Sequence, residues 1–129
     1  MLADKPVAAS IAVSDLARAR NFYENVLGLA SVQEMPGGVV YTSGGSAMLV
    51  YQSEYAGTNQ ATSATWAVGD EFDAIVQTLR DNGVTFEQYD NLPDTTRDGD
   101  LHSFGDGSFR SVWFKDPDGN ILNVGDASV

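Results

Sequence analysis

Residues 7–33 read VAASIAVSDLARARNFYENVLGLASVQ, and residues 61–88 read ATSATWAVGDEFDAIVQTLRDNGVTFEQ. The second stretch repeats the first at an offset of 55 residues, which carries Ala9 onto Ala64 and Gly28 onto Gly83. Further pairs at the same offset are Ala12 with Ala67, Val13 with Val68, Asp15 with Asp70, Ala19 with Ala74 and Gln33 with Gln88. Because the matches fall at equivalent positions of both stretches, they indicate an internal duplication.

Each copy begins with a short segment in which the residue type alternates. One face is the more apolar, with Ala9, Ile11 and Val13 in the first copy and Ala64, Trp66 and Val68 in the second. The opposite face carries only small side chains, namely Ala8, Ser10, Ala12, Ser63, Thr65 and Ala67. A period of two predicts a strand with one face on a core, and the small side chains of the other face leave room for a ligand.

A helix is predicted after each of these strands. Apolar residues recur at helical spacing over residues 16–27 and 72–79. Ser14-Asp15 and Gly69-Asp70 can cap the two helices at their starts, and Gly28 and Gly83 can end them. Three short strands should then complete each copy, near 30–34, 39–42 and 47–52, and near 84–88, 109–115 and 121–124.

The expected organisation is a single domain over 1–129, built from two βαβββ modules. The first module spans 7–52, a linker spans 53–61, and the second module spans 62–125. Residues 89–108 should form an irregular loop inserted in the second module, because they are rich in Asp and Gly.

Composition narrows the possible partners. The 129 residues carry 18 acidic and 7 basic side chains, a net charge of −11, and no cysteine. This charge disfavours nucleic acid and anionic membranes as partners, and the missing cysteines exclude disulfides and thiolate metal sites. The N-terminus lacks the pattern of a signal peptide, so we expect a cytoplasmic protein.

Two motifs carry a resemblance to a known superfamily: IAVSDLARARNFYENVLGL at 11–29 and WFKDPDGNILNV at 113–124. With the duplicated βαβββ pattern they resemble the vicinal oxygen chelate superfamily of glyoxalases, bleomycin resistance proteins and extradiol dioxygenases. The resemblance covers nearly the whole chain. It implies an α+β fold in which two tandem βαβββ modules form a cupped mixed sheet, but it implies no single activity, because one fold hosts many chemistries.

In metal-dependent members of this superfamily, His, Glu or Gln side chains from four strand positions hold one divalent ion. The resemblance places these positions at Ala8, Ser63, Asn123 and, with an alignment that can slip by one residue, Val50. Ala and Val offer no ligand atom, and neutral Ser and Asn are poor ligands for a hard cation. We therefore expect no metal and no other cofactor.

The inward faces of the cup supply the candidate ligand-binding residues. These are Ser10, Ala12, Met48, Val50, Ser63, Thr65, Arg110, Trp113 and Asn123. In the strand at 109–115 the sequence does not decide whether the face of Arg110 or that of Trp113 is inward. Arg110 can pair with an anionic ligand or with one of the protein's own carboxylates. In the competing interpretation, all these side chains simply fill the core.

Two function classes remain, and both follow the resemblance. The first is metal-independent binding of a small, partly aromatic organic molecule, similar in kind to sequestration by bleomycin resistance proteins. The second is a lyase, isomerase or dioxygenase-type enzyme with an unorthodox site, whose acid–base candidates are His102, Glu34, Glu54 and Asp100. A structural or regulatory dimer with a filled cavity is a third possibility.

His102 is the only histidine and the weak catalytic candidate. It can be a hydrogen-bonded structural residue, or it can lie at the edge of a pocket and transfer protons. The resemblance also implies a homodimer, in which the modules pair within one chain or between two.

Overall fold

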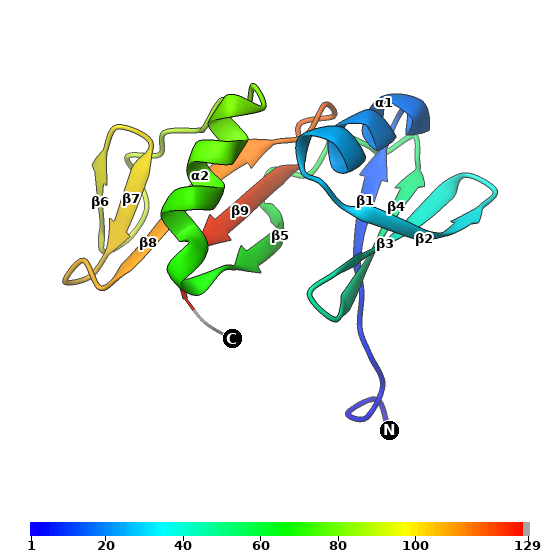
Figure 1. Ribbon diagram of the computed structural model, residues 1–129, viewed down its shortest axis with the longest axis horizontal. Helices are drawn as coiled ribbons and strands as arrows, with labels where there is room; N and C mark the ends of the chain where they lie inside the picture. Colours follow the sequence, from blue (N-terminus) through cyan, green and yellow to red (C-terminus); the bar gives the residue numbers. More distant parts are fainter. Residues whose placement is uncertain (128–129) are drawn as a thin grey trace. The chain divides into compact units, whose positions relative to one another are not determined.

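The computed structural model describes residues 1–127. The chain divides into two compact units, one of residues 1–63 with 116–120, the other of residues 64–115 with those from 121 onward. Each contains one four- or five-stranded sheet and one helical segment (Figure 1). The duplicated βαβββ pattern predicted from the sequence is confirmed.

The first unit is built around a four-stranded sheet in the order β1-β4-β3-β2. Its strands are β1 (Ala9–Val13), β2 (Ala30–Met35), β3 (Gly38–Ser43) and β4 (Ser46–Gln52). β1 runs parallel to β4, and the other neighbours are antiparallel. The helix α1 (Leu16–Arg20) continues directly into a π-helical segment, η1 (Asn21–Val26).

The π-helical segment differs from the regular helix expected through Leu27. The backbone N–H of Leu27 donates to the carbonyl of Phe22, five residues back, at 3.0 Å, and that of Leu29 donates to Tyr23 at 2.9 Å. Gly28 follows with a φ of 75°. The prediction that Gly28 ends this helix is confirmed, since glycine tolerates this left-handed conformation.

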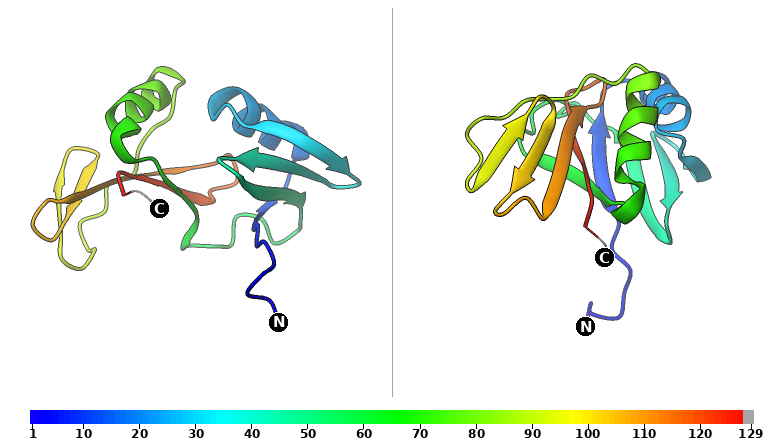
Figure 2. Two further views of the ribbon diagram at one scale, coloured as in Figure 1. Left: turned by 60° about the horizontal axis from the view of Figure 1, so that its bottom comes forward. Right: turned by 60° about the vertical axis from the view of Figure 1, so that its left-hand side comes forward.

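The second unit contains a five-stranded sheet in the order β5-β9-β8-β7-β6. Its strands are β5 (Thr62–Ala67), β6 (Thr95–Asp98), β7 (Leu101–Phe104), β8 (Phe109–Lys115) and β9 (Ile121–Gly125). A single 3-10 turn, η2 (Gly69–Glu71), leads into α2 (Phe72–Asp81). Figures 1 and 2 show α2 lying across one face of its sheet, with β6, β7 and β8 side by side.

The region between α2 and β8 departs from expectation. Residues 84–88 form no strand and make only an isolated bridge between Phe86 and Phe114. The insert expected to be irregular instead contains the β6–β7 hairpin, in which Asp98 pairs with Leu101 across Gly99-Asp100. Gly99 has a φ of 60°. The Gly99-Asp100 pair is thus a two-residue hairpin signal, with Gly at the position that needs a positive φ.

The two helices also begin differently. Asp15 caps α1, its carboxylate accepting the backbone N–H of Arg18 at 3.1 Å, as predicted. The predicted cap at Gly69-Asp70 is wrong, because these residues lie inside η2, and the residue preceding α2 is Glu71, whose side chain caps nothing. Within residues 1–127, no helix is both long and apolar enough to cross a bilayer.

Candidate functional site

Each sheet has one face that packs on a helix and one that does not. In the first unit Ile11, Val13, Val39 and Tyr41 are buried, and the ring of Tyr41 lies 6.1 Å from that of Tyr23 in η1. The prediction that Ile11 and Val13 lie on the core face is confirmed, and the structure shows that a helix covers this face. Ser10 and Ala12 point to the opposite, helix-free face, since strand side chains alternate.

The strand register corrects two of the predicted ligand-binding residues. Met48 pairs with Ala9, and Val50 with Ile11, so both lie on the helix-covered face of β4. They are 5% and 0% exposed and belong to the core. The neighbour of Ser10 is Leu49, so the alignment slips by one residue, and such a slip exchanges the two faces of a strand.

The helix-free face of the first unit is consequently lined by different β4 residues. Ser10 lies beside Leu49, and Ala12 beside Tyr51, which is 37% exposed. The residue on this face that corresponds to the missing metal position is therefore Leu49 rather than Val50. Leucine, like valine, has no atom that can ligate a cation, so this position is still unsuited to hold a metal.

In the second unit the structure decides which face of β8 is helix-free. Val112 and Phe114 are buried with Val124 and Leu122, their partners on β9. Trp113 therefore lies on the helix-free face, where its register partner is Asn123. The structure thus brings together two of the predicted site residues.

The amide of Asn123 is held in one orientation. Its Nδ2 donates to the Oγ of Ser111 at 2.6 Å and to the carbonyl of Val112 at 3.0 Å. Both amide hydrogens are therefore used within the sheet, and Oδ1 is the group that remains to meet a ligand. Ser63 and Thr65 lie on β5, next to β9 in the sheet, and Thr65 is exposed.

Arg110 does not belong to the helix-free face. Its Nε donates to Asp126 at 3.0 Å, its Nη1 donates to Asp73 at 3.0 Å, and its guanidinium lies 4.8 Å from the ring centre of Phe72. The hydrogen bonds that Arg110 donates to both carboxylates raise its pKa. Of the two predicted roles, pairing with the protein's own carboxylates is the one observed, and Arg110 is removed from the ligand-binding set.

His102 is buried and both its ring nitrogens are occupied. Nε2 accepts the backbone N–H of Tyr89 at 3.0 Å, and Nδ1 lies 3.1 Å from the carbonyl of Asp100. Because a carbonyl only accepts, the ring carries its proton on Nδ1 and is neutral. The ring contacts Trp113 edge to face, with centroids 4.9 Å apart. His102 is thus placed as a structural histidine rather than as an exposed base.

The remaining acid–base candidates are also engaged or remote. Glu34 is bonded to Arg20, and Asp100 to Arg80 at 3.3 Å. Glu54 is exposed. The carboxylates on these residues carry ion pairs or face solvent, and none sits on a helix-free sheet face opposite a second acid or base.

Tyr89 is a residue of this face that sequence reasoning missed. Its ring lies 5.7 Å from that of Trp113, at an interplanar angle of 73°. Its hydroxyl oxygen is buried and has no hydrogen-bond partner. No signal in the sequence marks Tyr89, because it follows α2 in a segment without regular structure.

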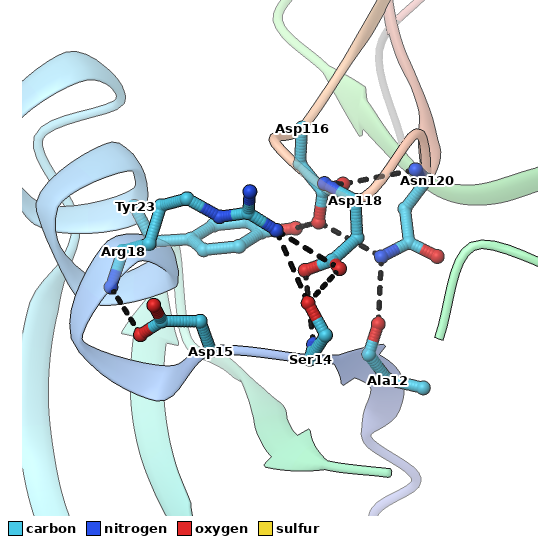
Figure 3. A network of polar contacts seen from close by, with 8 residues as sticks. All are labelled: Ala12, Ser14, Asp15, Arg18, Tyr23, Asp116, Asp118 and Asn120. Atoms are coloured by element: carbon cyan, nitrogen blue, oxygen red, sulfur yellow. Dashed lines mark hydrogen bonds and ion pairs between the residues drawn. The ribbon is translucent and has the colours of Figure 1, made fainter. Parts of the chain in front are cut away.

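The DPDGN motif forms a buried polar cluster with the start of the first unit, shown in Figure 3. The carboxylate of Asp116 accepts the hydroxyl of Tyr23 at 2.7 Å, the side chain of Asn120 at 2.8 Å and the backbone N–H of Asp118 at 2.9 Å. Asn120 Nδ2 also donates to the carbonyl of Ala12 at 2.8 Å. The turn thereby fixes the end of β1.

Asp118 extends the cluster toward the helix. It accepts the hydroxyl and the backbone N–H of Ser14 and the guanidinium of Arg18. We call the seven residues of this cluster the clasp: Ala12, Ser14, Arg18, Tyr23, Asp116, Asp118 and Asn120. Burial and the neighbouring Asp116 raise the pKa of Tyr23, so its phenol stays protonated and continues to donate.

The side chains of the described residues do not fit the metal of the superfamily. Over residues 1–127, no three His, Asp or Glu side chains come together where they could hold an ion. The position of Ser63 offers a neutral hydroxyl and that of Asn123 a neutral amide oxygen. Neither supplies charge to offset the dehydration of a divalent cation.

Comparison with known structures supports the fold. The fosfomycin resistance protein FosX from Mesorhizobium loti is 15% identical over 98% of this chain and 94% of its own, with a TM-score of 0.67. Lactoylglutathione lyase from Agrobacterium tumefaciens is 21% identical over 95% and 94%, with a TM-score of 0.67. The antibiotic-binding protein TnmS3 from Streptomyces sp. CB03234 is 22% identical over 99% of both chains, with a TM-score of 0.63.

A comparison with curated protein sequences gave no match. The family model of the Glyoxalase/Bleomycin resistance protein/Dioxygenase superfamily matches residues 5–124. The match includes both βαβββ modules and the DPDGN turn. The chain therefore belongs to the Glyoxalase/Bleomycin resistance protein/Dioxygenase superfamily.

Proposed function

We propose that this protein binds a small, partly aromatic organic molecule on the helix-free faces of its sheets, without a divalent metal. The observation that carries the proposal is the pair formed by Trp113 and Asn123. Trp113 offers a flat apolar surface, and the amide oxygen of Asn123 is fixed beside it. An apolar surface with a few oriented polar groups is the usual composition of a small-molecule site.

The side chains at the superfamily's ligand positions support binding without a metal. Ala8 and Leu49 have no ligand atom, and Ser63 and Asn123 are neutral. The proton-transfer candidate His102 also favours binding over catalysis, because both of its ring nitrogens are engaged within the fold. Binding requires neither a metal nor a free base, whereas the alternative enzymatic function requires at least one of them.

The descriptions of two structural neighbours are compatible with the proposal. One is an antibiotic-binding protein, and another is a fosfomycin resistance protein. Because both neighbours have low sequence identity to this chain, the similarity supports a shared fold only. The class of ligand is therefore inferred from Trp113 and Asn123. We further propose that the protein is a homodimer. The native mass spectrometry experiment described in the next paragraph also measures the number of subunits.

Native mass spectrometry of gently purified, untagged protein tests metal independence directly. We expect a mass without a divalent ion, and any co-purifying organic molecule would appear as an adduct. A stoichiometric divalent ion that survives purification would overturn the metal-free proposal.

A titration with 2-naphthol, a neutral flat probe, tests the site itself. Trp113→Leu should weaken its binding by about tenfold, the effect of losing roughly 1.4 kcal/mol of aromatic contact. Trp66→Phe is the matched control, because Trp66 lies on the other face of its strand, and it should leave the affinity unchanged. Unchanged affinity in Trp113→Leu, or loss of binding on adding EDTA, would contradict the proposal.

A further inference from the structure

Residues 88–93, which we call the strap, run beside the helix-free face of the second unit. The strap is fastened at both ends, where the N–H of Glu87 donates to the carbonyl of Trp113 at 2.8 Å and the N–H of Gly105 donates to that of Asp94 at 2.9 Å. Between these points it has no helix or strand. Its conformation therefore depends on side-chain contacts.

Tyr89 is the part of the strap that covers the proposed site. Its ring packs edge-on against Trp113 at 5.7 Å and tilted against His102 at 5.9 Å. The ring of Tyr89 therefore occupies one side of Trp113, and a ligand that stacks there has to displace it.

We infer that the strap is a pH-sensitive cover of Trp113, released when His102 gains a proton. The inference rests on the proposed function only in naming Trp113 as the ligand surface. In the closed state, Nε2 of His102 must be unprotonated to accept the N–H of Tyr89 at 3.0 Å. A proton on Nε2 places two donors face to face, and the hydrogen bond that holds Tyr89 is lost.

Each charged group around His102 is bonded to another partner, although Asp90 also interacts electrostatically with His102. Asp100 bonds to Arg80 and to Gln88. Arg97, the register partner of His102 on β6, bonds to Asp90 of the strap at 2.8 Å. On the β8 side, Lys115 pairs with Glu87 at 3.3 Å. The ring of His102 itself is 0% exposed.

A second observation, independent of His102, indicates that the closed strap is poised to open. The hydroxyl of Tyr89 is buried without a hydrogen-bond partner. Burial also raises the pKa of this phenol, so it is a neutral hydroxyl that lacks a partner. Opening of the strap exposes the Tyr89 hydroxyl to water, which can supply the missing hydrogen bond. The hydrogen bond from the Tyr89 N–H to His102 opposes this opening.

The strap should not detach completely. The hydrogen bond from Arg97 lowers the pKa of Asp90 below the usual range of a carboxyl. Histidine changes charge between about pH 5 and 8, where Asp90 is still ionised and still bonded to Arg97. We therefore expect a local release of Tyr89, with the remainder of the strap tethered.

Two measurements on the ligand-free protein test the inference. His102 is the only histidine, so its ring nitrogens give unique NMR signals, which we would follow from about pH 7.5 to about pH 5 to detect the Nδ1–H tautomer and the gain of a proton on Nε2. In a Trp66→Phe background, acrylamide quenching of Trp113 should rise about twofold over the same range as the ring protonates. Protonation without increased quenching would overturn the inference.

His102→Gln is the matched variant, because glutamine can accept the Tyr89 N–H and does not titrate. Its Trp113 quenching should be the same at both pH values, and an acid-induced rise equal to that of the parent would also overturn the inference. The wild-type NMR titration needs no variant, so the test survives if His102→Gln misfolds. Neither measurement uses a ligand, so failure of 2-naphthol binding would count against the proposed function alone.

Discussion

The two units share one βαβββ plan, and they differ most on their helix-free faces. In the first unit this face carries small or isolated side chains such as Ser10, Ala12 and Tyr51. In the second unit it carries a compact aromatic group of Tyr89, His102 and Trp113. The helix-covered faces are alike, with buried β-branched and aromatic side chains in both. Core packing therefore maintains the duplicated frame, whereas the opposite faces can differ between the units.

The units also hold their ends in different ways. The first unit is closed by the clasp, whose Asp116 takes four hydrogen bonds from three residues. The second unit uses Arg110, which bridges Asp126 and Asp73 nearer the surface. A buried, fully bonded carboxylate should matter more to stability than a partly exposed ion pair.

The largest effect is expected from Asp116→Ala. The change leaves the hydroxyl of Tyr23 and the backbone N–H groups of Asp118 and Asn120 without their acceptor. Unsatisfied buried donors cost about 1–3 kcal/mol each, and partial access to water should limit the total loss to about 3 kcal/mol. Urea unfolding, followed by far-ultraviolet circular dichroism, measures this change.

Glu54→Gln is the control for Asp116→Ala. Glu54 is an exposed acid of the same unit, and its change should stay within about 0.5 kcal/mol. A loss below about 1 kcal/mol in Asp116→Ala would show that the clasp contributes little, and the contrast between the units would then fail.

A smaller effect, a difference of about 2 kcal/mol between two variants, should separate the two faces of β4. Met48 and Leu49 are adjacent residues of similar size, but Met48 is 5% exposed on the helix-covered face and Leu49 lies half-buried on the other. Met48→Ala should cost about 3 kcal/mol, because it opens a cavity in the core. Leu49→Ala should cost about 1 kcal/mol. Equal losses on urea unfolding would contradict the assignment of faces.

Much of the fold could be predicted from sequence because its signals are local. The alternation of Ile11 and Val13 fixed one face of β1, and the stripe over 72–79 located α2. The assignment of Val50 failed for a physical reason. Residues 47–52 include a continuous apolar run, so their pattern does not determine which residues share a face, and the pairing of Val50 with Ile11 becomes visible only in the register.

Less of the candidate site could be predicted, because its contacts are long-range. Asn123 and Trp113 were both candidates, but alternation left open whether the face of Trp113 or that of Arg110 is inward, and only the register across β8 and β9 pairs Trp113 with Asn123. Arg110 was included because sequence does not show that Asp73 and Asp126 lie beside it. Tyr89 was missed because its contact with His102 forms only when the β6–β7 hairpin folds beside it. In the structure, the backbone N–H of Tyr89 then donates to Nε2 of His102. Whether these residues bind a ligand remains a prediction.

The smallest effect is expected at the starts of the two helices, where the sequences of the two copies are most alike. Asp15 and Asp70 occupy equivalent positions of the duplication, but only Asp15 accepts a backbone N–H of its helix, from Arg18. Asp15→Ala should therefore cost about 1 kcal/mol, and Asp70→Ala no more than about 0.5 kcal/mol. Both acids lie near a helix N-terminus, so the charge–dipole contribution is common to both, and the difference in urea unfolding isolates the capping bond. If the two losses were equal at high salt, where the charge contribution is screened, Asp70 would have to cap α2 in solution, and the helix starts would be as alike as their sequences.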